Sequence, residues 1–367
     1  MKRYPLGRVI ALPAAAALTF GIAACGSANE ESSGQGGDGN GSGLSGTISG
    51  AGASSQEAAQ KAWQASFLDA NPDVTVNYDP IGSGGGREQF VSGGSDFGGT
   101  DAFLDDEELA GAQERCGEVV EIPTYVSPVA VVFNLEGVEE LNLKPATIAK
   151  IFNQEITNWN DPEIAADNPD ADLPDQAITP VNRSDESGTT ENFVEYLTAA
   201  APEDWPHEVS GDWPVQGGEA AQGTSGVVQA VANGNGAIGY ADASMAGDLG
   251  TVKVGVGGEF VSYSPEAAAK VLEVSERIEG RGDYSFAYEL ARDTTEEGTY
   301  PIVLVSYALA CANYDDADTA EVVKAYFDYM ISSEGQQASA ENAGSAPISD
   351  ALRQELQPAV DAIGSGS

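Results

Sequence analysis

Residues on which hydrolytic enzymes depend are scarce in this sequence. Its 367 residues include a single histidine, His207, and only three cysteines. No Gly-x-Ser-x-Gly elbow supplies a nucleophile for that histidine, and one histidine cannot build a metal centre from imidazole ligands. A secreted phosphatase or serine hydrolase is therefore the weaker interpretation. The sequence predicts no catalytic residues, no metal site and no cofactor.

Basic residues are also scarce, with 16 lysines and arginines against 58 aspartates and glutamates. A negative field of this strength repels nucleic acid, because binding to its phosphates requires cations. No lysine follows a glycine, which excludes the glycine-rich loop that cradles nucleotide phosphates in an ATPase. Exposed charges are screened beyond about 8–10 Å at ordinary salt, so a local site can still hold an anion.

Long apolar runs are rare as well. The run from Val9 to Ala24 contains a proline and is too short to cross a bilayer, which takes about 20 residues. Basic residues flank its start, a pattern typical of an export signal. The residues that lead to Cys25 are similar to a bacterial lipobox, in which the cysteine becomes lipidated.

We therefore expect residues 1–25 to be a lipoprotein signal peptide that ends at the lipidated Cys25. The alternative is an ordinary cleaved signal in which this cysteine is incidental. Residues 26–45 are mostly small and polar, with Leu44 as the one large apolar side chain, and are expected to form a flexible tether. An acyl chain such as palmitate would then anchor the protein on the outer face of the cytoplasmic membrane.

Two cysteines remain, Cys116 and Cys311. In an exported chain, an isolated pair of cysteines is more often a disulfide than a redox or metal site. We therefore expect Cys116 and Cys311 to form a disulfide bond.

Short strand patterns alternate with amphipathic helix patterns, which indicates an α/β fold. Helices are expected over residues 56–70 and 319–332, and strands over residues 74–78 and 178–181. About 320 residues follow the tether, which is more than one hydrophobic core usually organises. Two domains are the expectation.

Three loops rich in glycine, serine or threonine precede predicted helices: residues 50–57, 82–87 and 182–190. Ser54 and Glu57 have the spacing of a capping box, and the second loop is expected to lead into a short helix at residues 88–91. Free N–H groups at helix starts attract anions. Each loop alone is more typical of a plain capped helix, but three together, with one cation in Arg183, favour a tetrahedral oxyanion.

These loops make the chain resemble the phosphate-binding receptors of ABC-type phosphate transporters, in the periplasmic-binding-protein superfamily. The similarity begins near Gly46 and extends to the C-terminal helices. Its landmarks are Gly50-Ala51-Gly52-Ala53-Ser54, Gly82-Ser83-Gly84, residues 96–101, 151–159, 183–189 and 236–240.

The resemblance implies a phosphate site. By position, its residues are Ser54, the N–H of Ser55, Ser83, Asp101, Arg183, Ser187, Gly188 and Thr189. Asp185 matches a carboxylate that pairs with the site arginine. Ser55 departs from relatives that carry a bulky aromatic residue there, which changes the wall but not the N–H.

The resemblance also implies two α/β lobes joined by two crossing strands, near residues 125–127 and 300–302, with the ligand in a cleft between them. Lobe one would comprise residues 46–126 and 303–367, and lobe two residues 127–302. Site residues would then come from both lobes, and binding would close the cleft by a hinge. The predicted disulfide would lie within lobe one.

The expected function is capture of inorganic phosphate outside the membrane by a monomer and its delivery to an ABC permease with a cytoplasmic ATPase. An ionised Asp101 can only accept hydrogen bonds. Phosphate near neutral pH still has a proton to donate, whereas sulfate has none. Asp101 therefore favours phosphate, although the fold alone leaves another oxyanion, an organic phosphate or a sensor role open.

Overall fold

The computed structural model describes residues 43–273 and 275–366, and Gly41–Ser367 belong to one compact unit. The predicted signal peptide, Cys25 and residues 26–42 of the predicted tether lie outside the described residues. None of the helices in the described ranges has the length and apolar character needed to cross a membrane.

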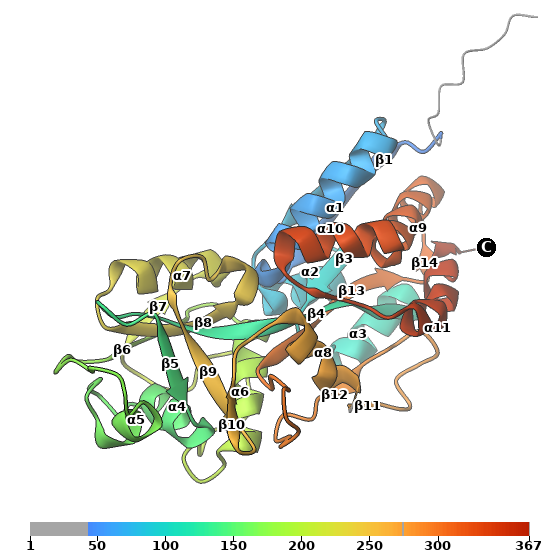
Figure 1. Cartoon of the computed structure of the whole chain (residues 1–367). Coiled ribbons are helices and arrows are strands. Elements are labelled where there is room, and N and C mark those ends of the chain that lie inside the picture. The colour runs from blue at the N-terminus through green and yellow to red at the C-terminus, as the bar shows by residue number, and fades with distance from the viewer. Residues whose placement is uncertain (1–42, 274, 367) are drawn as a thin grey trace, which may run out of the picture. The chain divides into compact units, whose positions relative to one another are not determined.

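A twelve-stranded mixed sheet runs through the described part of the chain, with the central order β2-β1-β3-β13-β4-β8-β6-β7. The confirmed fold class is α/β (Figure 1). The strands are β1 (Gly46–Gly52), β2 (Val74–Asp79), β3 (Phe97–Thr100), β4 (Val119–Asn134), β5 (Glu140–Leu143), β6 (Thr179–Arg183), β7 (Glu219–Ala221), β8 (Ala237–Asp242), β9 (Gly250–Val256), β10 (Glu259–Val261), β13 (Val303–Cys311) and β15 (Ala346–Pro347). Two small ribbons pair β11 (Glu276–Arg277) with β12 (Tyr288–Glu289) and β14 (Asn313–Tyr314) with β16 (Gly364–Ser365).

The long strand β4 belongs to both halves of this sheet. Its first part, up to Pro128, pairs with β13, and its second part, from Val129, pairs with β8 and β9. All its residues except Asn134 are buried, as expected for a strand rich in β-branched residues and covered on both faces. The sheet therefore has two halves that share one continuous strand, in a two-lobe architecture.

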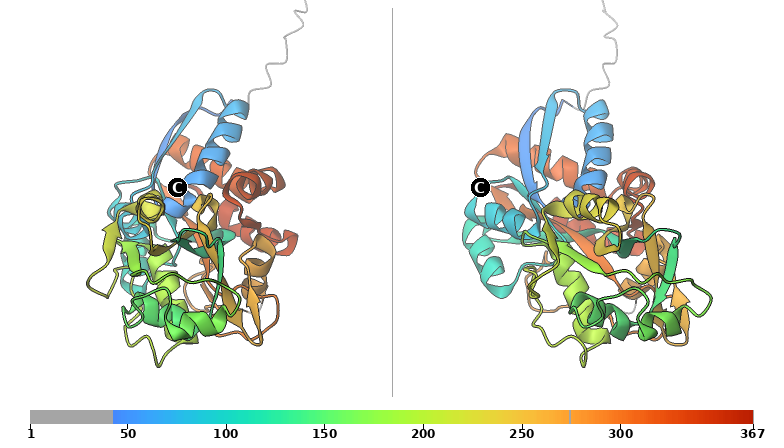
Figure 2. Two further views of the ribbon diagram at one scale, coloured as in Figure 1. Left: turned by 60° about the vertical axis from the view of Figure 1, so that its left-hand side comes forward. Right: turned by 90° about the vertical axis from the view of Figure 1, so that its left-hand side faces the viewer.

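Helices cover the faces of both halves (Figures 1 and 2). In the first lobe α2 packs on β1 and β3, and α9 packs on β1; in the second, α7 packs on β6 and β8, and α6 packs on β8. The helices are α1 (Glu57–Ala70), α2 (Ser83–Ser92), α3 (Asp106–Cys116), α4 (Pro145–Phe152), α5 (Pro162–Asp167), α6 (Gly188–Ala200), α7 (Gly223–Asn233), α8 (Pro265–Glu273), α9 (Ala317–Ile331), α10 (Ser333–Ala343) and α11 (Asp350–Asp361), with short 3-10 turns η1 (Ser54–Gln56) and η2 (Ala243–Met245).

The start of α1 differs from the predicted capping box. Ala59, Trp63 and Phe67 form the expected buried stripe of this helix. Ser54, however, lies in the 3-10 turn η1, and no side chain caps α1 at Gln56. The capping-box prediction is wrong because the Ser54 hydroxyl is engaged elsewhere, with a residue of α7.

The second glycine-rich loop is also different from its prediction. Helix α2 begins at Ser83 and includes all three glycines from Gly84 to Gly86, so the expected loop followed by a helix at residues 88–91 is wrong. Close packing explains the difference, because a Cβ atom at Gly86 would lie 2.3 Å from the Gly52 Cα atom. Glycine has a low helix propensity, but here it allows the helix to lie against β1.

Cys116 and Cys311 form a disulfide bond across 195 positions of sequence, which confirms the prediction. Cys116 is the last residue of α3 and Cys311 is the last residue of β13. The bond therefore ties the early and late parts of the chain together within one half of the sheet.

Candidate anion-binding site

Asp101 lies immediately after β3 and is almost completely buried, at 2 % exposure. Three hydroxyl groups donate to its carboxylate. Ser55 and Thr189 donate to Oδ2 at 2.5 and 3.3 Å, and Ser306 donates to Oδ1 at 3.0 Å. Ser55 and Ser306 approach from the first half of the sheet and Thr189 from α6, so the carboxylate joins the two lobes.

Burial raises the pKa of Asp101 above its ordinary value, because desolvation penalises the charged carboxylate. The hydroxyls of Ser55 and Ser306, the positive charge of Arg183 and the hydroxyl of Thr189 oppose this rise. Asp101 is thus an acceptor whose charge depends on the polar groups around it.

Arg183 supplies the cation that the sequence analysis singled out. It is the last residue of β6, it is 3 % exposed, and it pairs with Asp185 through Nε–Oδ1 and Nη2–Oδ2 contacts of 2.9 and 2.5 Å. Asp185 also accepts a 3.0 Å hydrogen bond from the N–H of Gly223. Burial opposes ionisation of Asp185, but the hydrogen bonds and charge of Arg183 prevail and lower its pKa. This bidentate ion pair fixes the plane of the Arg183 guanidinium group.

Helix α6 starts beside Asp101 and contributes Gly188 and Thr189. The Ser187 hydroxyl caps this helix by accepting a 3.3 Å hydrogen bond from the N–H of Thr190. Gly188 lies against the other lobe, since a Cβ atom there would be 2.7 Å from Ser83 Oγ and 2.8 Å from Asp101 Cβ. The hydroxyl of Ser83 in turn accepts from the N–H of Asp101 at 3.1 Å.

Ser54 of the first lobe contacts α7 of the second lobe directly. Its Oγ lies 3.0 Å from Thr224 Oγ1 and accepts a 3.1 Å hydrogen bond from the Thr224 N–H. Thr224 is the second residue of α7, so the start of a further helix borders the site. Sequence reasoning did not single out α7, because Gly223 and Thr224 carry no distinctive motif.

The structure thus brings the predicted residues together in two connected groups. One contains Ser55, Ser83, Asp101, Gly188 and Thr189, and the other contains the pair of Arg183 and Asp185. Ser54 contacts Thr224 rather than another predicted residue, and Ser187 caps its own helix.

Asn192 and Arg292 support this arrangement and were missed by sequence reasoning. The Asn192 Nδ2 group donates to the carbonyl oxygens of Asp101 and Gly188 at 2.6 and 2.7 Å, so it ties β3 to α6. Arg292 donates to Asn192 Oδ1 and to Glu195 Oε2, the latter at 2.8 Å. No local pattern marks either residue, because their partners lie 91 and 100 positions away.

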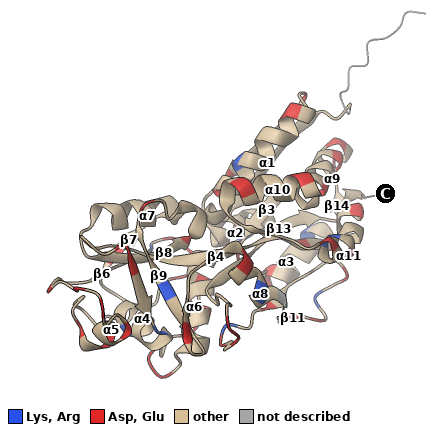
Figure 3. Cartoon of the chain, viewed as in Figure 1, with Lys and Arg blue, Asp and Glu red and all other residues tan. Residues whose placement is uncertain are grey.

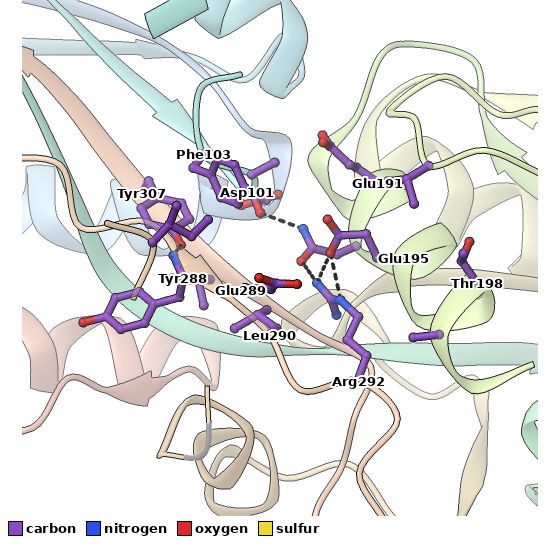
Figure 4. Close-up of a pocket in the computed structure, with 16 residues that line it drawn as sticks. Asp101, Phe103, Glu191, Glu195, Thr198, Tyr288, Glu289, Leu290, Arg292 and Tyr307 are labelled. Carbon is purple, nitrogen blue, oxygen red and sulfur yellow. Dashed lines mark hydrogen bonds and ion pairs between the residues drawn. The ribbon is translucent and has the colours of Figure 1, made fainter. Parts of the chain in front are cut away.

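A pocket of about 400 Å³ adjoins Asp101 and is lined by residues of both lobes (Figure 4). Glu191 and Glu195 come from α6, Tyr288 and Glu289 from β12, and the ring of Phe103 from the segment after β3. Its carboxylates, like the many acidic positions along the chain in Figure 3, make the surroundings of the site unfavourable for an anion. The buried arginines of the site, Arg183 and Arg292, must therefore provide the local attraction for an anion.

His207 is engaged away from any predicted site residue. Its Nε2 lies 2.9 Å from Asn153 Oδ1, and its ring stands edge-on to Trp205. Among the described residues, none of the site's seryl hydroxyls hydrogen-bonds to His207, so no serine–histidine pair forms there.

Comparison with known proteins places this chain in a family. The PBP superfamily domain matches residues 35–334. The phosphate-binding protein PstS 3 of Mycobacterium leprae is 35 % identical over 99 % of this chain and 100 % of its own length. The phosphate-binding protein PstS of Haemophilus influenzae is 32 % identical over 80 % of this chain and 87 % of its own.

Solved structures share the fold. The phosphate-bound high-affinity periplasmic phosphate-binding protein PfluDING aligns with a TM-score of 0.69 and 22 % identity, covering 85 % of this chain and 93 % of its own. A phosphate-binding protein from Stenotrophomonas maltophilia aligns with a TM-score of 0.64 and 20 % identity over the same shares. Since the superfamily domain matches most of the chain and PstS relatives match nearly all of it, the chain belongs to the PstS family of phosphate-binding proteins.

Proposed function

We propose that this protein binds inorganic phosphate and delivers it to the permease of an ABC-type phosphate transporter. The observation that carries the proposal is Asp101, a buried carboxylate that contacts groups from both lobes in a chain of the PstS family. The relatives are phosphate-binding proteins by name rather than enzymes. We accordingly expect the protein to bind phosphate without hydrolysing phosphate esters.

The proposed ligands of the ion come from both lobes. They are Ser54, Ser55, Ser83 and Asp101 from the first lobe and Arg183, Ser187, Gly188 and Thr189 from the second. Asp185 orients the arginine. A phosphate ion held by both sets would stabilise the lobes in contact, and its release would require them to separate.

The proton on phosphate gives Asp101 its role. An ionised carboxylate accepts a hydrogen bond from monohydrogen or dihydrogen phosphate, whereas sulfate would leave it facing a second acceptor. Sites built to hydrogen-bond a group reject the analogue that lacks it by roughly 10⁴–10⁵-fold. This mechanism favours phosphate over sulfate. An organic phosphate remains the second candidate, because the pocket of about 400 Å³ adjoins Asp101.

The lobe boundaries and the anchor complete the proposal. Lobe one comprises residues 46–126 and 303–367, lobe two residues 127–302, and the crossings lie near residues 125–127 and 300–302. The register of β4 supports a crossing near Pro128, where its partner changes from β13 to β8. Export by residues 1–25, lipidation at Cys25 and a monomeric state are part of the same proposal.

Calorimetric titration of the purified chain, stripped of bound ion, tests the function. Phosphate is expected to bind tightly and sulfate not to bind, while Asp101→Asn is expected to admit sulfate. If the folded, stripped protein bound no phosphate, the proposal would be wrong. Preferred binding of a phosphate monoester over inorganic phosphate would instead establish the second candidate.

A further inference from the structure

Arg87 lies between the two lobes, outside the set of residues proposed to hold phosphate. It belongs to α2, one helical turn after Ser83, and is only 5 % exposed. Its Nε donates to Glu108 Oε1 at 2.8 Å and its Nη1 to Thr100 Oγ1 at 3.2 Å. Since both partners are in the first lobe, that lobe alone holds the guanidinium group in position.

The same guanidinium group contacts two carboxylates of the second lobe. Its Nη2 donates to Glu186 Oε1 at 2.9 Å, and its Nη1 lies 3.8 Å from Glu191 Oε2. Glu186 immediately precedes Ser187, and Glu191 is in the first turn of α6. Arg87 therefore connects the end of β3, next to Asp101 in one lobe, with the start of α6 in the other.

The fold makes room for this contact. A Cβ atom at Gly84 would lie 2.1 Å from Glu186 Oε2 and 2.2 Å from its Cδ. Any side chain at position 84 would displace the carboxylate that Arg87 holds. The glycine of α2 is therefore matched to the glutamate of the opposite lobe.

Electrostatics make Arg87 necessary when the lobes meet. Contact between the lobes brings Glu108, Glu186 and Glu191 around one guanidinium group. Burial raises the pKa of Glu191 to about 7; Arg87 opposes this rise, and the neighbouring carboxylates of Glu195, Glu108 and Glu186 add to it. Without Arg87, lobe contact would bring these like charges together, and the partly buried Glu191 would be left without the cation that opposes its pKa rise.

We propose that Arg87 is a positioning residue that slows phosphate release by holding Glu186 and Glu191 of the second lobe while the lobes are in contact. This inference rests on the proposed function. When the lobes separate, Arg87 keeps its partner Glu108, so the fold of the first lobe does not depend on the inter-lobe pairs. The interaction stabilises only the state in which the lobes are in contact.

Rapid-mixing kinetics of phosphate binding test the inference. Glu186→Gln is expected to raise the dissociation rate about tenfold, with a smaller change in the association rate, because a charge pair formed after encounter acts on release. Arg87→Lys should retain part of the effect, since it keeps the charge but loses the fork. In a double-mutant cycle, Arg87→Gln should raise the dissociation rate less in the Glu186→Gln background than in the wild type, because only the contact with Glu191 remains to be lost.

Glu203→Gln is the matched control, because it removes one exposed acidic charge from the same lobe. A dissociation rate for Glu186→Gln that equals that of the control, or fully additive effects of Arg87→Gln and Glu186→Gln, would refute the role of Arg87. Thermal unfolding of each variant separates loss of fold from loss of lobe contact.

Failure of the proposed function gives a different result. In that case the wild-type chain itself binds no phosphate. The lobe-closing role is then judged by X-ray scattering of the ligand-free proteins. Glu186→Gln should have a larger radius of gyration than wild type and the Glu203→Gln control, and equal radii would refute it.

Discussion

Ser306 donates a 3.0 Å hydrogen bond to Asp101 Oδ1 from 205 positions further along the chain. It lies in β13 and is fully buried. Ser306→Ala removes one donor to the carboxylate, so Asp101 is held less firmly and its pKa rises further. We expect roughly tenfold weaker phosphate binding by calorimetry at neutral pH.

Ser95→Ala is the matched control for Ser306→Ala. Ser95 is a buried serine of the first lobe, and among the described residues its hydroxyl has no hydrogen-bond partner. The control should bind phosphate as the wild type does. Equal phosphate affinities for the two alanine variants would show that the Ser306 hydrogen bond to Asp101 does not contribute to phosphate binding.

The raised pKa of Asp101 predicts that rejection of sulfate fails in acid. As pH falls through this pKa, the carboxyl group gains a proton and becomes a donor to a fully ionised oxyanion. Sulfate affinity should therefore rise between about pH 7 and about pH 4 in the wild type. Asp101→Asn should bind sulfate with little pH dependence over the same range. If the wild type rejected sulfate equally at every pH in this range, the proposed role of Asp101 as acceptor of the phosphate proton would be wrong.

Gly188→Ala is expected to hinder contact between the lobes. The added Cβ atom would lie 2.7 Å from Ser83 Oγ and 2.8 Å from Asp101 Cβ, both in the opposite lobe. Such overpacking costs about 1–3 kcal/mol, which corresponds to phosphate affinity weaker by roughly 5- to 150-fold. Gly226→Ala in α7 is the control, because its Cβ would meet only Ala221 at 3.5 Å. Unchanged affinity of Gly188→Ala would mean that the lobes do not meet here in the bound state.

Loss of the disulfide should weaken the first lobe without changing the site. The bond closes a loop of 195 positions, and removing a native disulfide costs about 2–5 kcal/mol of unfolding free energy. Cys116→Ala combined with Cys311→Ala should therefore unfold at lower denaturant concentration. Its phosphate affinity, measured well below the unfolding transition, should match that of the oxidised wild type. Reduced affinity in the folded double variant would indicate that the bond also shapes the cleft.

Asp242 gives a pH dependence of stability with a defined sign. Burial raises its pKa to about 6, hydrogen bonds from Ser244 oppose the rise, and the negative charge of Asp101 adds to it. The folded state therefore holds this proton more tightly than the unfolded state. The stabilisation is complete below the ordinary pKa of about 4 and is lost as pH rises through 6.

Asp242→Asn removes this titration while keeping an oxygen that can accept from Ser244. Denaturant unfolding should show the variant gaining stability relative to wild type between about pH 4 and about pH 7, by roughly 1–3 kcal/mol. A constant difference between the two proteins across this range would contradict the assignment to Asp242.

Local patterns in the sequence predicted the elements well. The helix expected at residues 56–70 is α1, and the strands expected at 74–78 and 178–181 are β2 and β6, because hydrophobic periodicity is a local signal. The errors at Ser54 and at the glycine run of α2 have one cause. Both segments are shaped by close tertiary contacts, with Thr224 and with β1, which no local pattern contains.

The residues of the site also divide into those that a local motif marks and those whose role depends on tertiary structure. Asp101, Arg183 and Thr189 belong to segments with recognisable motifs, so the contact of Thr189 with Asp101 could be expected from the sequence. Ser306 and Asn192 sit inside a strand and a helix, where a serine or asparagine carries no special signal. Their role depends on register and on the pairing of β13 with β3 and β4, which are tertiary properties.

The place of β13 between β3 and β4 constrains how the protein is made. Synthesis proceeds from the N-terminus, so β3 and β4 are complete about 170 residues before β13 emerges, given their ends at Asn134 and its start at Val303. Until then two strand edges stay unpaired and Cys116 has no partner. Unpaired edges template aggregation, so the first lobe stays open to such pairing until β13 emerges, and the disulfide bond of Cys116 must wait for the last fifth of the chain.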